Sequence, residues 1–166
     1  MKKAKRLLFL FLTILILVPI VAVCVSASST YVPNTSNTNI TNFDVPYYSY
    51  SKLVDPRRKM DTSPLYLYLE NLGYSNYNIL VQAIGCISET DKTSTVNLTV
   101  YNGSLVPYVA CRESVHYAVR SDICEESYEY ASLRFQDRGE ASGNLIASGY
   151  WSPDSLGSYT TAPYPG

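Results

Sequence analysis

Residues 64–69 read PLYLYL, and this alternation of leucine and tyrosine decides the predicted fold. Leu65, Leu67 and Leu69 fall on one side of an extended chain, whereas the tyrosines between them fall on the other side. A period of two is typical of a β-strand with one buried face and one wet face. The segment therefore predicts a half-buried strand that carries tyrosine on its outer face.

The segments that follow repeat strand-like patterns. Residues 79–84 (ILVQAI) are almost entirely apolar, which favours a central strand that is buried on both faces. Residues 95–101 alternate again, and the pattern places Val96, Leu98 and Val100 inward. Further strands are predicted over residues 105–111, 117–123, 131–135 and 144–151.

Two of these segments have the pattern of a hairpin. Apolar side chains alternate within residues 117–123 and 131–135, and the polar run EES at 125–127 supplies a bend between them. With this hairpin the chain holds about seven short strands and no convincing helix after the leader. We therefore predict an all-β fold, a single antiparallel β-sandwich or barrel that follows an N-terminal signal helix.

The leader, residues 1–27, has the three parts of a signal peptide. It begins with a basic stretch, continues with apolar residues at 7–25, and ends in the small residues of a cleavage site at Ala27. Cleavage there predicts a secreted protein, and Pro19 favours cleavage because it interrupts the apolar run. The apolar run also approaches the ~20 residues needed to cross a bilayer, so a protein anchored by residues 7–25 is the alternative.

Composition divides the remainder into three parts. Residues 28–56 are rich in Ser, Thr and Asn, and we expect a linker there because the segment offers little apolar surface to bury. Residues 57–155 hold most of the strand patterns and form the predicted β-sandwich domain. Residues 156–166 are expected to be a flexible tail. The basic run Arg57-Arg58-Lys59 is interpreted as a solvated turn before the first strand.

Charge and motifs exclude several classes of function. Without the leader the chain keeps 9 basic and 14 acidic residues, and this net charge of −5 does not suit nucleic-acid binding. The sequence holds no Gly-x-Ser-x-Gly, no His-Glu-x-x-His and no glycine-rich phosphate loop. Cys111, His116 and Arg120 are the residue types of a sortase-type site, but their order and spacing differ. We therefore expect a non-enzymatic protein without catalytic residues or a cofactor.

Three cysteines, Cys86, Cys111 and Cys124, follow the leader. In an oxidising compartment two of them can form a disulfide and one is left over, and their spacing does not decide which pair forms. Intervals of 25 and 13 residues, with His116 as the only histidine, do not make the pattern of a zinc site. No metal site is therefore expected.

Tyrosine is the most distinctive residue type, with 16 in the chain. Its ring packs on a pleated surface while its hydroxyl stays in water. Outward rows of such rings suit a sugar or a protein partner, whereas cross-strand pairs of the same rings only stabilise the sheet, and the sequence leaves both interpretations open. The predicted binding surface consists of Tyr66, Tyr68, Tyr101, Tyr108, Tyr150 and Trp151, and Tyr159 is also expected to face outward.

Three short segments carry a resemblance: residues 58–66 (RKMDTSPLY), 128–133 (YEYASL) and 149–155 (GYWSPDS). Together they resemble small, secreted, β-rich proteins of Gram-positive bacteria that have no assigned function. The Gly-x-Trp-Ser-Pro-Asp-Ser ending is the most specific part. The resemblance covers about residues 57–155 and implies an exported, compact domain. It assigns no catalytic residue.

The expected function is therefore that of a secreted binding module at the cell envelope. Its expected partner is a protein or a glycan, and it meets a membrane only through an uncleaved leader. Some of the similar secreted proteins share their size and export with bacteriocins. A bacteriocin-like toxin or antagonist is accordingly the alternative function.

Overall fold

The computed structural model describes residues 34–74, 77–90, 92–139, 141 and 143–165. All the described strands belong to one compact unit, Val32–Gly166. The predicted signal peptide lies outside the described residues. Over the described ranges every regular element is a β-strand, and no helix is long and apolar enough to span a membrane.

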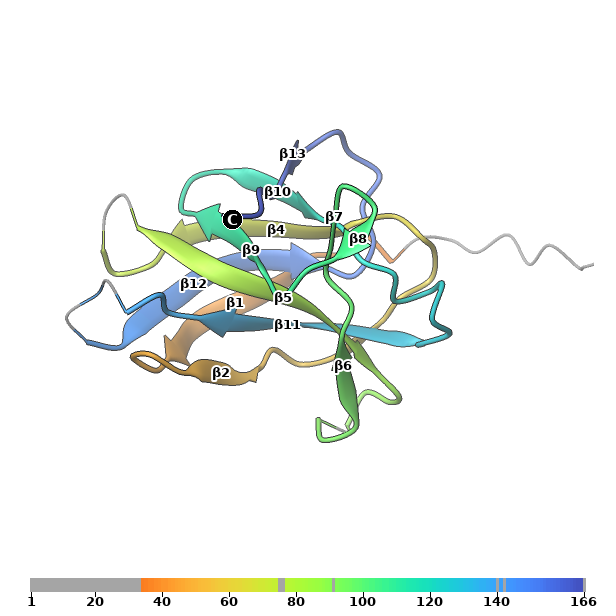
Figure 1. Ribbon diagram of the computed structural model, residues 1–166, viewed down its shortest axis with the longest axis horizontal. Helices are drawn as coiled ribbons and strands as arrows, with labels where there is room; N and C mark the ends of the chain where they lie inside the picture. The colour runs from red at the N-terminus through yellow and green to blue at the C-terminus, as the bar shows by residue number, and fades with distance from the viewer. Residues whose placement is uncertain (1–33, 75–76, 91, 140, 142, 166) are drawn as a thin grey trace, which may run out of the picture. The chain divides into compact units, whose positions relative to one another are not determined.

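The first sheet has five strands in the order β1-β12-β4-β10-β13 (Figure 1). Their bounds are Thr38–Val45 for β1, Leu145–Ser152 for β12, Leu65–Asn71 for β4, His116–Val119 for β10 and Thr160–Thr161 for β13. Neighbouring strands run antiparallel except for β10 and β13, which run parallel. This sheet therefore joins the beginning, the middle and the end of the domain.

The second sheet has six strands built around β5 and β11. Its main path is β2 (Tyr50–Leu53), β11 (Tyr130–Gln136), β5 (Asn78–Cys86) and β6 (Thr95–Asn97), while β3 (Arg57–Arg58) also pairs with β11 and β9 (Val109–Arg112) also pairs with β5. A separate hairpin consists of β7 (Val100–Tyr101) and β8 (Ser104–Leu105). The described residues thus form 13 strands, many of them shorter than the segments expected from the sequence.

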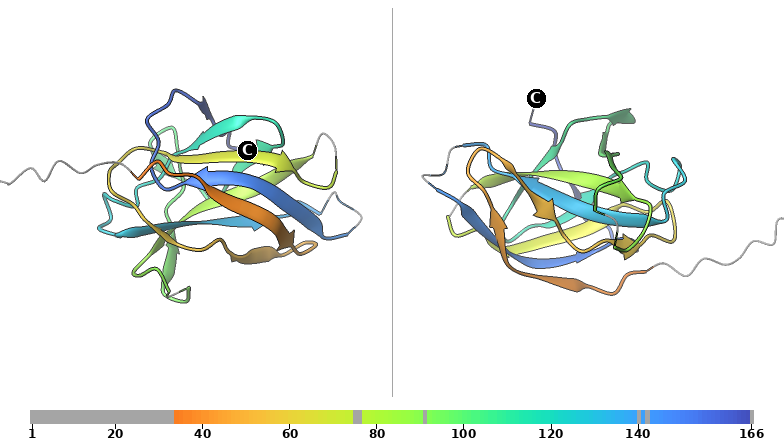
Figure 2. Two further views of the ribbon diagram at one scale, coloured as in Figure 1. Left: turned by 180° about the vertical axis from the view of Figure 1, so that it is seen from behind. Right: turned by 90° about the horizontal axis from the view of Figure 1, so that it is seen from below.

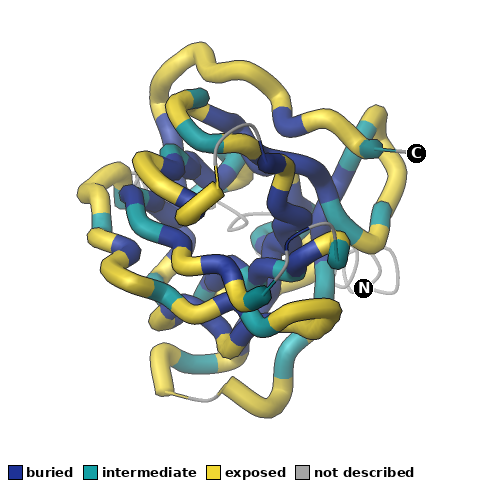
Figure 3. Tube along the Cα trace, turned by 90° about the vertical axis from the view of Figure 1, so that its left-hand side faces the viewer, coloured by how far each residue is buried: buried dark blue, intermediate teal, exposed yellow. Residues whose placement is uncertain are grey.

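The two sheets lie face to face, and the hydrophobic core fills the space between them (Figures 1 and 2). Leu65, Leu67 and Leu69 of β4 are fully buried in this core, as the alternating pattern predicts. Figure 3 shows buried stretches of the chain toward the inside of the molecule and exposed stretches toward its outside. Neither sheet closes on itself, so the fold is all-β and sandwich-like. The central strand β5 is buried on both faces, which confirms its prediction.

The predicted hairpin is wrong, because its two arms belong to different sheets. β10 pairs with β4 and β13 in the first sheet, whereas β11 pairs with β5, β2 and β3 in the second. The segment between them carries the chain from one sheet to the other. Both arms point their apolar side chains into the same core, and alternation alone identifies that face without identifying the strand's partner.

The predicted linker and tail also differ from the structure. β1 and β2 lie within residues 28–56, and β13 lies within residues 156–166. Ile40 and Val45 of β1 are buried, and Phe43 packs against the same core. β12 supplies backbone hydrogen-bond partners along β1, so these three apolar side chains are enough to hold this edge strand. Ala162, which follows β13, is buried in the same core.

Residues 95–101 follow their predicted alternation only in part. Leu98 and Val100 are buried, but Val96 is 43% exposed and Thr99 is completely buried. The reason is that the segment is divided between β6 and β7, which belong to different sheets. Thr99 is tolerated inside because its hydroxyl accepts a hydrogen bond from the Ala83 backbone N–H at 2.8 Å.

An aromatic face on the first sheet as the candidate binding surface

The tyrosines of the predicted binding surface separate into two groups. Tyr66, Tyr68 and Tyr150 lie together on the outer side of the first sheet, with His116 and Tyr159 beside them. We call these five residues the aromatic face. Tyr101 and Tyr108 lie elsewhere and flank Tyr164, with ring centroids 6.2 and 6.1 Å from it. The structure therefore does not bring all the predicted tyrosines onto one surface.

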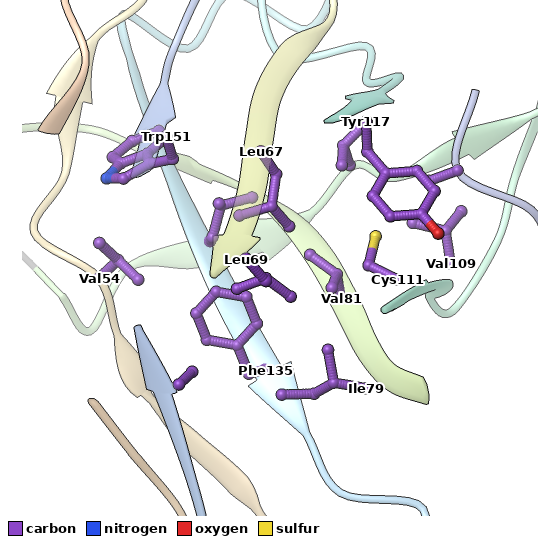
Figure 4. Close-up of a cluster of buried hydrophobic side chains, with 14 of the residues drawn as sticks. Val54, Leu67, Leu69, Ile79, Val81, Val109, Cys111, Tyr117, Phe135 and Trp151 are labelled. Atoms are coloured by element: carbon purple, nitrogen blue, oxygen red, sulfur yellow. The ribbon is translucent and has the colours of Figure 1, made fainter. Parts of the chain in front are cut away.

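Trp151 does not belong to either group, which corrects its place in the predicted surface. Its side chain is completely buried, and Figure 4 shows it in the core near Leu67. Successive side chains of a strand point to opposite faces, so Tyr150 and Trp151 cannot both face outward from β12. Tyr150 occupies the outer position and Trp151 the inner one.

The sheet register aligns the aromatic face across three strands. Tyr150 of β12 lies opposite Tyr68 of β4, and His116 of β10 lies opposite Tyr68 on its other side. A β-bulge at Gly149 immediately precedes Tyr150. A Cβ atom on Gly149 would lie 2.0 Å from the Tyr68 carbonyl oxygen, so β12 and β4 can approach this closely only with glycine there.

His116 is the centre of the aromatic face. Its ring stacks on Tyr68 with centroids 4.3 Å apart and an interplanar angle of 17°. Its Nδ1 lies 2.8 Å from the Tyr66 hydroxyl, which fixes the ring from the other side. The ring centroid of Tyr159 lies 6.3 Å from that of His116, on which it stacks, and 4.8 Å from that of Tyr66. The rings thus hold one another in fixed orientations.

Burial distinguishes the supporting rings from the accessible ones. Tyr66 lies on the outer side of β4, as the alternation predicts, but it is only 8% exposed because His116 and Tyr159 lie against it. Tyr68 and Tyr150 are half-buried, and His116 and Tyr159 are exposed. Alternation along residues 116–119 places His116 on the wet side of its strand, opposite Tyr117, and the structure has it exposed there. The sequence analysis did not predict that His116 lies among the tyrosines. Its outward position in the alternation is the signal that could have indicated this.

Two hydroxyls of the aromatic face have perturbed acidity. Burial raises the pKa of Tyr66, and the neighbouring Tyr159 and Tyr68 add to that effect. The negative charge of Glu70 raises the pKa of Tyr150, and a hydrogen bond between the two side chains adds to it. Both phenols therefore keep their protons at neutral pH and can donate hydrogen bonds.

A depression of about 400 Å³ adjoins the aromatic face. It is lined by Ser114, Val115, His116, Ser158, Tyr159 and Thr160. Two aromatic rings and several hydroxyl groups therefore border one concave region beside the flat row of Tyr68 and Tyr150. Such a surface combines apolar contact area with hydrogen-bonding groups, which is what sugar rings and protein partners both require.

A larger groove of about 830 Å³ lies between the edge strands β1 and β2. Its walls include the apolar Ile40 and Phe43 and the cationic Lys92 and Arg134. Both of these cations already have partners: Lys92 pairs with Asp55 at 2.6 Å, and Arg134 lies 5.8 Å above the Tyr50 ring. No sequence signal pointed to this groove, because its strands fall in the predicted linker. We therefore retain the aromatic face as the candidate site.

The cysteines form neither the disulfide nor the thiol site that the sequence raised as options. Cys111 pairs with Ile79 at one end of β5 and Cys86 lies at the other end, seven residues away. That is about 23 Å along a strand, far beyond the reach of a disulfide. Within the described residues no disulfide joins any two of the three cysteines. Burial strongly raises the pKa of the Cys111 thiol, and Figure 4 shows its sulfur in the core beside Tyr117.

His116 and Cys111 also lie on different sheets, and the histidine points away from the core. The structure therefore separates the residues that resembled a sortase-type set. In the part of the chain that the structure describes, no three His, Cys, Asp or Glu side chains are grouped so that they could hold a metal ion.

Two of the segments that carry the sequence resemblance meet in a cluster that we call the clasp, formed by Lys59, Ser63, Asp154 and Ser155. Lys59 and Asp154 form an ion pair at 3.0 Å, and both side chains are completely buried. The Ser63 hydroxyl accepts a hydrogen bond from the Ser155 backbone N–H at 2.9 Å. The basic run before the first predicted strand is therefore not wholly solvated, because Lys59 is only 4% exposed.

The comparisons with known proteins identify a family for this chain. A family described as "Protein of unknown function (DUF2712)" matches residues 27–155. No curated protein and no solved structure matches the chain. The family match ends at Ser155, the last residue of the clasp, and includes every residue of the aromatic face except Tyr159. The chain therefore belongs to DUF2712, a family of proteins of unknown function.

Proposed function

We propose that this protein is a secreted, non-enzymatic binding module that holds a glycan or protein partner at the cell envelope through its aromatic face. The observation that supports this proposal most directly is the stacked pair of Tyr68 and His116, with centroids 4.3 Å apart. Rings that are already fixed lose little conformational freedom when a partner arrives.

The accessibility of the rings supports binding in addition to packing. Tyr159 is 38% exposed, His116 is exposed, and Tyr68 and Tyr150 are half-buried on the same outer face. Cross-strand stacking accounts for the contacts between the rings, but it does not account for the adjoining depression bordered by His116 and Tyr159. Half-exposed tyrosines supply apolar area and a hydrogen-bonding hydroxyl together, a combination that is enriched at binding surfaces.

Export is the second part of the proposal. It depends on the signal-peptide pattern of residues 1–27, with its basic start, apolar run and small-residue end. A secreted protein of acidic composition with an aromatic surface patch meets its partner outside the cell. An export assay in which the leader is deleted tests this part separately from the binding surface.

The binding test compares two matched pairs of tyrosines. Purified residues 28–166 are titrated against an isolated cell-envelope fraction, once as the wild type and once with Tyr68→Ala and Tyr150→Ala together. The control variant carries Tyr101→Ala and Tyr108→Ala, because these rings are equally half-buried but lie outside the aromatic face. We expect the first variant to bind at least about tenfold more weakly and the control to bind like the wild type.

Three results would change this proposal. Equal binding by all three proteins would remove the aromatic face from the interaction. Loss of binding after protease treatment of the envelope fraction would select a protein partner, and survival of binding would select a glycan. Clear killing of related bacteria by the purified protein in a spot assay would replace the binding module with a secreted antagonist.

A further inference from the structure

The ion pair of the clasp places an amine and a carboxyl group together without access to water. Lys59 Nζ lies 3.0 Å from Asp154 Oδ1, and neither side chain is exposed at all. Condensation requires a neutral amine, and the hydrogen bond between Nζ and Oδ1 gives the proton a direct path from the amine to the carboxyl group. The neutral amine that results is a nucleophile, and the neutral carboxylic acid is its electrophile.

Backbone groups around the pair are arranged for a reaction at the Asp154 carboxyl carbon. Oδ2 accepts a hydrogen bond from the Asn34 N–H at 2.6 Å, and the Met60 N–H is shared between Oδ2 at 3.1 Å and Oδ1 at 3.2 Å. Two fixed N–H donors on one oxygen stabilise the negative charge that develops there when a nucleophile adds to the carboxyl carbon. The carbonyl oxygens of Ser63 and Pro153 lie 2.6 and 2.9 Å from Nζ and hold the amine in place.

We propose that Lys59 and Asp154 condense to an intramolecular isopeptide bond. A proton first passes from Lys59 Nζ to Asp154 Oδ1 along their hydrogen bond. The Nζ lone pair then adds to Cγ, and the electron pair of the carbonyl bond moves to Oδ2. The intermediate collapses as the Cγ–Oδ1 bond breaks, and Oδ1 leaves with a second proton from Nζ as one water molecule. The step requires no oxidant, reductant or added group.

A second ion pair of the same chain provides a built-in control. Lys92 Nζ lies 2.6 Å from Asp55 Oδ1, which is closer than the buried pair, but these side chains are 43% and 87% exposed. Water hydrates both partners of an exposed pair and so competes with the transfer of a proton between them. If proximity alone decided, the exposed pair would condense. If burial decides, Lys59 and Asp154 condense instead.

The bond would join residues that are 95 positions apart in the chain. It would link the segment that precedes β4 to the segment that follows β12. A covalent link across a long loop limits the freedom of the unfolded chain, as a disulfide does. Here the link would act in a domain whose described cysteines form no disulfide with one another.

Peptide mapping of the folded wild-type chain tests the proposal. Trypsin cuts after Lys and Arg, so a linked chain releases residues 59–92 joined to residues 139–166, with a mass lower by one water than the two peptides together. We expect this joined product in the wild type and its absence in Lys59→Arg, which keeps the charge but cannot form the amide. No product that joins Lys92 to Asp55 is expected.

Two results would overturn the proposal. The first is a wild-type sample with a cooperative unfolding transition that yields peptides 60–92 and 139–166 separately at full mass. The second is a joined product at Lys92 and Asp55 in an amount equal to that at Lys59 and Asp154, because burial would then have no part in the selection. Neither result bears on the aromatic face.

Discussion

The clasp and the aromatic face both contain polar side chains, but they differ in burial and in the kind of contact between their members. In the clasp Lys59 Nζ lies within hydrogen-bond distance of three oxygen atoms, the Asp154 carboxyl group accepts hydrogen bonds from two backbone N–H groups, and both side chains are fully buried. In the aromatic face the rings stack on one another and keep part of their surface in solvent. The clasp is therefore suited to holding the fold, and the aromatic face to meeting a partner.

The comparison also explains what the most specific motif of the sequence does. In GYWSPDS, Gly149 permits close approach to β4, Trp151 fills the core, and Asp154 holds Lys59. Only Tyr150 contributes to the outer surface. A short, distinctive motif thus marks a structural junction here, whereas the candidate site is composed of residues from three strands and from the segment before β13.

The largest expected effect breaks the clasp. Replacing Asp154 with Ala leaves Lys59 Nζ buried without its partner, and we expect the free energy of unfolding to fall by about 4 kcal/mol. Urea titration followed by the fluorescence of Trp151, the single tryptophan, measures the change. A loss below about 1 kcal/mol would show that the buried pair does not hold the fold.

The second prediction affects both regions, because Gly149 lies between them. A Cβ atom at this position would lie 2.0 Å from the Tyr68 carbonyl oxygen and 2.9 Å from the Leu69 Cα atom, so β12 and β4 must separate. We expect Gly149→Ala to cost about 3 kcal/mol in the free energy of unfolding and to weaken binding by the aromatic face. Gly143→Ala is the control, since its Cβ would meet no atom within 4 Å. Equal unfolding midpoints for the two variants would contradict the close approach.

The third prediction concerns pH and the aromatic face alone. The pKa of Tyr66 is raised above its ordinary value of 10.0, so the unfolded chain loses the phenol proton at a lower pH than the folded chain. The protonated Tyr66 phenol therefore contributes to the free energy of unfolding. This contribution is complete below pH 10 and is lost as the pH rises through the pKa of Tyr66 in the folded chain. Tyr66→Phe removes the part of the fall in stability at alkaline pH that comes from this phenol. It also costs about 1 kcal/mol at neutral pH, because the hydrogen bond to His116 disappears.

Unfolding curves of the wild type and Tyr66→Phe, recorded at several values between about pH 8 and 11, measure this difference. The two stabilities should converge as the pH rises. Parallel curves over the whole range would mean that Tyr66 ionises equally in the folded and unfolded chains.

The smallest effect is expected at the exposed ion pair, which sharpens the contrast with the clasp. Lys92 and Asp55 lie closer together than Lys59 and Asp154, but their exposure leaves little net gain from pairing. Lys92→Ala should change the free energy of unfolding by less than about 1 kcal/mol, measured by the same urea titration. A loss as large as that of Asp154→Ala would show that burial does not govern the strength of these pairs.

The sequence by itself determined the local features of this protein. The alternation of Leu65, Leu67 and Leu69 with tyrosine is set by the pleat of a single strand, and the apolar run at 79–84 likewise identifies a strand buried on both faces. These patterns need no knowledge of the partner strand. They were enough for the all-β fold and for the outward position of His116.

Only the tertiary structure decided which strands pair and which distant side chains meet. β10 and β11 show equivalent patterns but join different sheets, and β1 becomes ordered in a polar segment because β12 supplies its backbone partners. The aromatic face depends on the registers of β12, β4 and β10, and the clasp joins residues 95 positions apart. Pairing and burial depend on the whole chain, because a strand's hydrogen bonds and a buried charge are satisfied by groups that no local pattern contains.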